Sequence, residues 1–286
     1  MNGDTRSAIW LSYSSISDFQ KCPRAYYYGY IYKNPKSGKK ITITNKHLAL
    51  GQTVHAVLDQ LSTRETADRF DVDVKKLYDD AWTNVEGKKG GFTQDADEKE
   101  FKERGWQMLE KVLVDPGPLT HKAVKIKAEI DLPRYWFSEK DNLILCGKID
   151  WLEYLEETDS VHIIDFKTGK LTEKEDSLQL PIYYLLASNA QPRPVTKMSY
   201  WYLFNDAGLV QVDLPDEKKS KERIMEVGKR IKLARQLNHF KCATGGDDGC
   251  MHCAPYEAIV SGKCIFVGVD NYGKESYMLD DSSVAF

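Results

Sequence analysis

The chain has 286 residues, of which 42% are hydrophobic and 29% charged, as is typical of a globular protein with a substantial core. Its formal net charge of -3 excludes a protein that coats nucleic acid by bulk charge, although one local basic groove remains compatible with it. No apolar stretch is long enough to span a bilayer, and the first ten residues lack the apolar core of a secretory signal. We therefore expect a soluble, cytoplasmic protein.

The N-terminal part of the chain is predicted to be mainly helical. Several serines between Ser12 and Ser17 offer N-caps for a helix that runs through Phe19 towards Cys22-Pro23. Apolar spacing predicts two further helices, over Gly51–Leu61 and over Asp97–Val114. The glycine-rich segment between them, Thr83–Asp95, is predicted to be a surface loop.

The second part of the chain alternates strands with helices. Residues rich in β-branched and aromatic side chains predict strands over Lys125–Phe137, Asn142–Leu155, Val161–Lys167, Thr196–Phe204 and Gly208–Leu214. Helices are expected from about Ser177, with Pro181 in the first turn, and over Asp216–Leu237. The predicted fold class is α/β, with a central mixed sheet flanked by helices. We expect one domain over residues 1–270, an irregular cysteine-bearing end, and a C-terminal tail over 271–286.

Two acidic residues and a lysine form the sharpest pattern. Asp150 ends the segment Gly147-Lys148-Ile149-Asp150, and Asp165 and Lys167 lie two apart in a predicted strand, so their side chains share a face. A short connection favours an antiparallel pair of strands, which would bring Asp150 beside Asp165. Two carboxylates and a lysine suit a hard divalent cation and phosphodiester hydrolysis. The alternative is a solvent-facing Asp and Lys at a strand end.

The cysteines suggest a second site. Cys250 and Cys253 have the spacing that metal sites favour, and Cys264 follows shortly after. A disulfide framework is not expected without a secretory signal. Cys242 offers a further thiolate, which with Cys250, Cys253 and Cys264 would make a local zinc site that His252 could join. Cys146, inside a predicted strand, is expected to be a buried structural cysteine.

The order of these motifs resembles the RecB-like branch of the PD-(D/E)XK nucleases, which includes AddB-type subunits and small CRISPR-associated adaptation nucleases. The matching segments lie between Ser12 and Cys264 and are, in order, Ser12-x-Ser14-x-Ile16-x-x-Phe19-x-x-Cys22-Pro23-Arg24-x-Tyr26, Gly51-x-x-x-His55, Gly147-x-x-Asp150 with Asp165-x-Lys167-Thr168-Gly169, Gln179-x-x-x-Tyr183, and the C-terminal cysteines. Each motif is weak alone, and their joint order makes the resemblance specific. The resemblance implies a restriction-endonuclease-like core.

The resemblance also implies roles for individual residues. His55, Asp150, Asp165 and the main-chain carbonyl of Phe166 would bind Mg²⁺ or Mn²⁺, and Lys167 would be the catalytic lysine. An imidazole ligand suits Mn²⁺ as well as Mg²⁺. Gln179 and Tyr183, one helical turn apart, would border the site, unless Tyr183 belongs to the apolar face with Leu186. Glu129 aligns less securely with an acidic position that some members use.

For the cysteines, the resemblance implies that Cys22 joins Cys250, Cys253 and Cys264 around a [4Fe–4S] cluster that staples the two chain ends together. The interval between Cys253 and Cys264 is longer than is usual in the relatives, and Cys242 competes for the fourth position. Zn²⁺ is therefore the alternative to the iron–sulfur cluster.

The leading functional hypothesis is a metal-dependent DNA exonuclease that acts on single strands or ends, in DNA repair, recombination or phage DNA processing. A phage-encoded protein would act in the host cytoplasm. A second hypothesis is a catalytically silent DNA-binding or scaffold subunit of a helicase–nuclease complex, and a third is a zinc-stapled interaction protein. A helicase or recombination partner would be a separate chain, because the sequence carries no helicase motif. Cleavage polarity, exo- or endonucleolytic attack, DNA or RNA preference and oligomeric state stay open.

Overall fold

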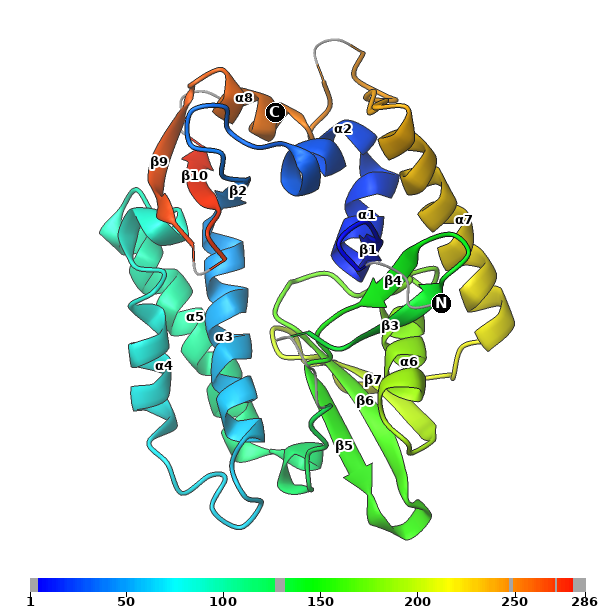
Figure 1. The fold of residues 1–286 in the computed structure, drawn as a ribbon. Helices are drawn as coiled ribbons and strands as arrows, with labels where there is room; N and C mark the ends of the chain where they lie inside the picture. The colour runs from blue at the N-terminus through cyan, green and yellow to red at the C-terminus, as the bar shows by residue number, and fades with distance from the viewer. Residues whose placement is uncertain (1–4, 127–131, 247–248, 271, 280–286) are drawn as a thin grey trace. The chain divides into compact units, whose positions relative to one another are not determined.

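The computed structural model describes residues 5–126, 132–246, 249–270 and 272–279 (Figure 1). The chain divides into two compact units, each assembled from three segments. Unit 1 consists of Met1–Tyr13, Leu50–Ala81 and Lys102–Gly228, and unit 2 of Ser14–Ala49, Trp82–Phe101 and Lys229–Phe286. The expectation of one domain over residues 1–270, followed by a tail, stays a prediction.

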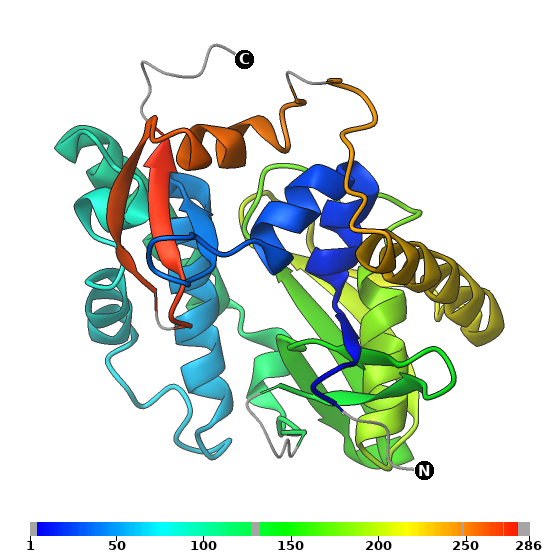
Figure 2. The same ribbon diagram turned by 45° about the horizontal axis from the view of Figure 1, so that its top comes forward.

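Unit 1 is built on a four-stranded sheet. Its strands are β5 (Trp151–Leu155), β6 (Ser160–Lys167), β7 (Val195–Tyr202) and β8 (Gly208–Val212), in the order β5-β6-β7-β8. The β6–β7 pair is parallel and the two outer pairs are antiparallel. A parallel pair needs a crossover connection, and α6 (Gln179–Ala190) supplies it and packs on β6 and β7 (Figures 1 and 2).

A smaller sheet in unit 1 contacts the same helix. It contains β1 (Ile9–Leu11), β4 (Leu143–Cys146) and β3 (Arg134–Ser138), in the order β1-β4-β3. Strand β4 is buried along its whole length, runs parallel to β1 and antiparallel to β3, and lies with β3 against α6. The apolar run in β4 therefore forms part of the core beneath the large sheet's crossover helix.

Besides α6, four other α-helices contribute to unit 1. They are α3 (Lys46–Ser62, from Leu50), α4 (Val74–Trp82, to Ala81), α5 (Asp95–Val114, from Lys102) and α7 (Glu217–Gln236, to Gly228). On α3 the buried stripe consists of Val54, Val57, Leu58 and Leu61, the spacing expected of a core-facing helix. His55 lies beside this stripe, so the packing of α3 fixes its position.

Unit 2 contains a three-stranded sheet and several short helices. The sheet consists of β2 (Ile41–Thr44), β10 (Glu275–Leu279) and β9 (Cys264–Val269), in the order β2-β10-β9. The helices are α1 (Tyr13–Lys21, from Ser14), α2 (Pro23–Tyr26), the π-helical turn Tyr27–Ile31 and α8 (Ala254–Val260). The prediction of an irregular end was wrong for α8, β9 and β10, because β9 and β10 find their partners in each other and in the distant β2.

The predicted fold class is confirmed: helices accompany sheets with both parallel and antiparallel pairs. Helix α6 begins at Gln179 and tolerates Pro181 in its first turn, as the sequence predicted. The predicted loop at Thr83–Asp95 contains a short 3₁₀ turn, Gly87–Gly90. Within the described part of the chain, no helix combines the length and apolar character needed to cross a membrane.

Candidate active site and cysteine group

The pairing of β5 with β6 brings the two predicted carboxylates together. Trp151 pairs with Ile164, so one step further along the antiparallel register places Asp150 opposite Asp165. The Phe166 N–H donates a hydrogen bond of 3.0 Å to Asp150 Oδ2. The N–H and C=O of a strand residue point to the same edge of the strand, so the carbonyl of Phe166 also faces Asp150. The predicted antiparallel pair is confirmed.

Helix α3 supplies the imidazole beside this pair. His55 Nδ1 lies 3.1 Å from Asp150 Oδ1. Burial on its own lowers the pKa of His55, but the charge of Asp150 and the hydrogen bond to it outweigh burial and raise that pKa. A Cβ at Gly51, one turn earlier on α3, would lie 3.2 Å from Thr168 Oγ1. The glycine of the Gly-x-x-x-His motif therefore allows close approach between α3 and the end of β6.

Asp165 is a buried carboxylate with an incompletely satisfied oxygen. Its Oδ1 accepts a hydrogen bond of 2.7 Å from Gln179 Nε2, and its Oδ2 lies 3.0 Å from Lys167 Nζ in an ion pair. No partner with hydrogen-bond geometry for Oδ2 lies among the described residues. Burial, and then the charge of Asp150, raise the pKa of Asp165 to about 7. Asp150 therefore still disfavours the ionised form of Asp165 despite the nearby Lys167 and His55, and a bound cation would offset this repulsion.

Lys167 is held between two carboxylates. Its Nζ lies 3.0 Å from Asp165 Oδ2 and 2.9 Å from Glu173 Oε2, and it donates a hydrogen bond to Gln179 Oε1. Burial favours a lower pKa for Lys167, but Asp165 and Glu173 together raise it. The ammonium group is therefore charged and fixed in direction, as a group that stabilises phosphate charge must be.

Glu173 and Tyr13 are site residues that the sequence analysis missed. The Tyr13 hydroxyl donates a hydrogen bond of 3.0 Å to Glu173 Oε1, and the backbone N–H of Glu173 donates to the Tyr202 hydroxyl at 3.0 Å. Glu173 lies in a polar loop between β6 and α6 that has no periodic pattern, and Tyr13 is distant in sequence. In the sequence, the polar loop after Lys167 was the only indication of a further site residue, and it contains several acidic residues among which the sequence does not choose.

Gln179 and Tyr183 lie where the sequence placed them. Gln179 Nε2 is 3.4 Å from the Tyr183 hydroxyl, and both side chains are buried on α6. Burial raises the pKa of Tyr183 well above its usual value, so the hydroxyl keeps its proton. Gln179 bridges Asp165 and Lys167, which makes it a residue that orients both. The sequence left open whether Tyr183 borders the site or belongs to the apolar face with Leu186. Tyr183 does both, since it is buried on α6 near Leu186 and also contacts Gln179.

The donors around Asp150 and Asp165 suit a divalent cation. Carboxylate and carbonyl oxygens are ligands that Mg²⁺ prefers, and an imidazole nitrogen also suits Mn²⁺. The unsatisfied Oδ2 of Asp165 and the raised pKa of its carboxyl group are the observations that favour such an ion. Glu129, the less secure acidic candidate, lies outside the described residues.

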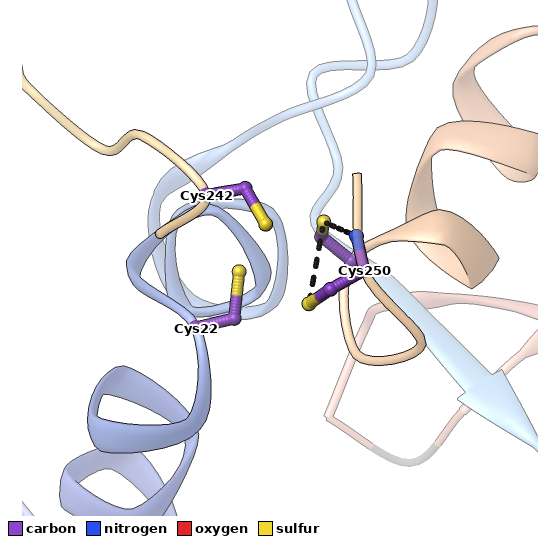
Figure 3. Close-up of side chains that lie close together, drawn as sticks. Cys22, Cys242 and Cys250 are labelled. Atoms are coloured by element: carbon purple, nitrogen blue, oxygen red, sulfur yellow. Dashed lines mark hydrogen bonds between the residues drawn. The ribbon is translucent and has the colours of Figure 1, made fainter. Parts of the chain in front are cut away.

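Four cysteines converge in unit 2. The sulfur atoms of Cys22, Cys242, Cys250 and Cys253 all lie within 4.8 Å of one another, and Figure 3 shows the labelled three turned towards a common centre. Cys264 lies on β9, where its pairing with Leu279 holds it outside this group. The group thus contains Cys242 in place of Cys264, the expected fourth ligand, and it does not include His252. Which of these residues bind a metal stays a prediction.

Local structure orders the four thiols. Cys22 and Cys253 are the N-cap residues of α2 and α8, and an ion pair of 2.8 Å between Arg24 and Glu257 links these two helices. Backbone N–H groups, first that of Gly245, lower the pKa of Cys242 to about 6. The lowered pKa favours a thiolate, the form that binds metals. Cys146 lies buried on β4, as expected of a structural cysteine.

The spacing of the sulfurs can be compared with the spacing in two kinds of metal centre. Four thiolates at about 2.3 Å from one tetrahedral ion lie about 3.8 Å apart. An iron–sulfur core lies between its thiolates and holds them farther apart. Sulfur atoms that all lie within 4.8 Å of one another, with 3.9 Å between Cys250 and Cys253, match the single ion more closely.

Comparisons with known proteins identify the family of this chain. A family model described as the PD-(D/E)XK nuclease superfamily matches residues 10–259. A crystal structure from Eubacterium rectale described as a "Putative exonuclease" is similar over 85% of this chain and 86% of its own, with 9% identity and a TM-score of 0.48. A search of curated protein sequences finds no match. The family match covers most of the chain, including His55, Asp150, Asp165 and Lys167, and so this protein belongs to the PD-(D/E)XK nuclease superfamily.

Proposed function

We propose that this nuclease is a metal-dependent DNA exonuclease that acts on single strands or ends. The observation that carries the proposal is the convergence of Asp150, Asp165 and Lys167, with His55 hydrogen-bonded to the first carboxylate. The settings that the family resemblance implies are DNA repair, recombination or phage DNA processing, with any unwinding supplied by a separate partner chain. The order of motifs is most similar to the RecB-like and AddB-like branch.

The residues divide the work of hydrolysis between them. His55, Asp150, Asp165 and the Phe166 carbonyl would hold Mg²⁺ or Mn²⁺, which supplies Lewis-acid stabilisation of charge on the phosphate. Lys167 contributes a fixed positive charge beside the scissile phosphate and orients the attacking water. Gln179 holds both Asp165 and Lys167, and Tyr183 buttresses Gln179. No covalent nucleophile is needed.

We propose that Cys22, Cys242, Cys250 and Cys253 bind a structural metal centre. A centre held by thiolates from both ends of the sequence orders unit 2 without taking part in hydrolysis. A [4Fe–4S] cluster is what the family resemblance implies, whereas the sulfur spacing supports a single Zn²⁺ ion. The cysteine group therefore supports metal binding by unit 2. The sulfur spacing fits a Zn²⁺ ion better than a [4Fe–4S] cluster.

Matched linear and circular single-stranded DNA test the exonuclease assignment. Both substrates are internally labelled, of the same length and composition, and incubated with Mg²⁺ or Mn²⁺. An exonuclease degrades the linear form to short products and leaves the circle intact. Cleavage of both forms at similar rates would identify an endonuclease. Inertness towards both forms, and towards duplex DNA, would favour the catalytically silent subunit.

A further inference from the structure

A group of aromatic and basic side chains in unit 2 lies outside both the candidate active site and the cysteine group. A hollow of about 350 Å³ is lined by Tyr30, Ile31, Arg235, Asn238 and Phe240. Its wall comes from the π-helical turn after α2, from the last turn of α7 and from the chain that follows α7. None of these residues has a role in the site described above.

The aromatic rings that line the hollow lie against Tyr26 and Tyr27, in stacked or tilted pairs. Phe240 is 5.2 Å from Tyr27 and 6.2 Å from Tyr26, with interplanar angles of 32° and 28°. Tyr30 is 5.0 Å from Tyr26 at 21°. Tyr26 is fully buried, whereas Tyr27, Tyr30 and Phe240 are half-buried. The partly exposed rings of Tyr30 and Phe240 are therefore stacked on the buried ring of Tyr26.

The backbone on both sides of the hollow is unusual. Residues Tyr27–Ile31 form a π-helical turn, a conformation that is rare and often found at functional sites. On the other side, Asn238 adopts a left-handed conformation with φ of 47° and ends α7, and the His239 N–H donates to the Ala234 carbonyl at 2.9 Å. This turn places Phe240 against the tyrosines. The Tyr30 hydroxyl donates to Asp18 Oδ2 at 2.9 Å, which fixes the Tyr30 ring.

Positive charge is concentrated here although the chain as a whole is slightly acidic. Burial, followed by the nearby charges of Lys274, Arg235 and Lys33, lowers the pKa of Lys40. Arg235 also lies 5.9 Å from the ring centroid of Tyr26. The charges of Lys274, Arg235 and Lys33 all act on Lys40, and clustered cations attract phosphates.

We infer that Tyr27, Tyr30 and Phe240 form a stacking site for the bases of single-stranded nucleic acid, with Arg235, which lines the hollow, binding an adjacent phosphate. Aromatic faces beside a basic groove are the arrangement that binds single strands without sequence preference. The inference rests on the proposed function for the choice of DNA as the strand. A site of this kind would hold a single strand by its bases as well as by its charge.

The first test compares two fluorescent strands of about 12 nucleotides, one of oligothymidine and one abasic along its length, a size that suits a single-strand-binding module. Binding is measured by anisotropy in the full-length Lys167→Ala protein without added divalent cation. We expect the oligothymidine to bind at least about 5-fold more tightly, as one base–aromatic stack contributes. Phe240→Leu should abolish this difference, whereas Phe266→Leu, at a half-exposed phenylalanine on β9, should preserve it.

The second test separates charge from packing. Arg235→Gln should reduce the slope of log binding constant against log salt concentration by about 0.7, the value expected for one phosphate contact on a single strand. Lys263→Gln, at an exposed lysine before β9, should leave that slope unchanged. Loss of stability alone would not alter the slope in a protein that stays folded.

Equal binding of the two strands, or equal discrimination by Phe240→Leu and Phe266→Leu, would overturn the inference. The result is independent of the nuclease assay. A protein that cleaves DNA but does not distinguish bases from abasic sugars would retain the proposed function and lose this site. A protein that discriminates but never cleaves would retain the site and lose the proposed function.

Discussion

Glu173 Oε2 lies 2.9 Å from Lys167 Nζ, and the other oxygen of this carboxylate accepts a hydrogen bond from Tyr13. The lysine is thus positioned by a residue outside the Asp-x-Lys motif. Because Glu173 helps to raise the pKa of Lys167, it also helps to keep the ammonium group charged at alkaline pH.

Glu173→Gln should lower the nuclease rate about 10-fold, because Lys167 loses one of two charged partners and its direction is less well fixed. The substitution also lowers the pKa of Lys167, so the alkaline limb of the pH–rate profile should move to lower pH. Steady-state rates between neutral and alkaline pH measure both effects. Glu175→Gln, at an exposed glutamate in the same loop, should match wild type. An unshifted profile in Glu173→Gln would remove Glu173 from the site.

Asp165→Asn should abolish cleavage while stabilising the metal-free protein. The folded-state pKa of about 7 lies above the ordinary 3.8, so the ionised carboxylate costs stability as pH rises through this interval. Removing that charge should raise the melting temperature at pH 7.5 by about 2–4 °C, which corresponds to about 1 kcal/mol in a protein of this size. An Asp165→Asn protein that melts well below wild type would show that the ionised Asp165 carboxylate does not destabilise the metal-free protein.

A divalent cation should stabilise wild type and not this variant. Binding at one hundred times the dissociation constant adds about 2.7 kcal/mol to the free energy of unfolding. Melting curves with and without Mn²⁺, after the cysteine-bound metal has been quantified, measure the effect. Equal stabilisation of wild type and Asp165→Asn would place the cation elsewhere.

The sequence predicted the catalytic strands because their signals are local. Asp165 and Lys167 follow from the two-residue period of β6, and Asp150 follows from a short antiparallel connection. Gln179 and Tyr183 follow from helical spacing on α6. Glu173 could not be predicted in this way, because an irregular loop has no period and its contact with Tyr13 depends on the whole unit.

A network between Glu153 on β5 and His162 on β6, both buried, should make the protein less stable in acid. Glu153 accepts hydrogen bonds from His162 and His121, and His162 Nε2 lies 2.8 Å from Ser199 Oγ. Burial lowers the pKa of His162 in the folded protein. As the pH falls through 6.5, His162 therefore becomes protonated in the unfolded chain while it stays neutral in the folded protein. The neutral His162 contributes fully to the free energy of unfolding above pH 6.5. This contribution is lost as the pH falls, by up to about 1.4 kcal/mol per pH unit.

Urea unfolding at pH 7.5 and 5.5 tests this, with His162→Gln as the variant and the exposed His239→Gln as the control. Other groups also titrate between these pH values, so the comparison is the difference in acid sensitivity between proteins. His162→Gln should lose less stability on acidification than wild type, and His239→Gln should lose as much. Equal acid sensitivity in all three proteins would show that His162 is not the responsible group.

Cys242→Ser should lose the bound metal, and Cys264→Ser should retain it. The reason is that Cys242 lies within 4.8 Å of the other three sulfurs, whereas β9 holds Cys264 apart. Elemental analysis for zinc and iron, with visible absorption spectra of anaerobically purified protein, measures both metal content and identity. One zinc per chain without visible absorption is the expected result for wild type. Metal loss in Cys264→Ser but not in Cys242→Ser would reverse the assignment.

The cysteines show where sequence spacing is insufficient. Cys250 and Cys253 are close in sequence and were predicted to act together, but the choice between Cys242 and Cys264 depends on strand pairing. Cys264 pairs with Leu279 in a sheet that also requires β2, more than two hundred residues earlier. Such long-range pairing leaves no local pattern, and for the same reason the C-terminal strands were expected to be irregular.

The measurement that most directly tests the central claim is the digestion of end-labelled single-stranded DNA with Mn²⁺ by wild type, Lys167→Ala and Lys140→Ala. Lys140 is an exposed lysine between β3 and β4 and serves as the matched control. We predict that wild type and Lys140→Ala degrade the strand at the same rate. Lys167→Ala should be at least about 100-fold slower, as for the loss of one transition-state donor, in a protein whose circular dichroism spectrum shows that it is folded. A folded Lys167→Ala protein that cleaves as fast as wild type would contradict the proposed active site.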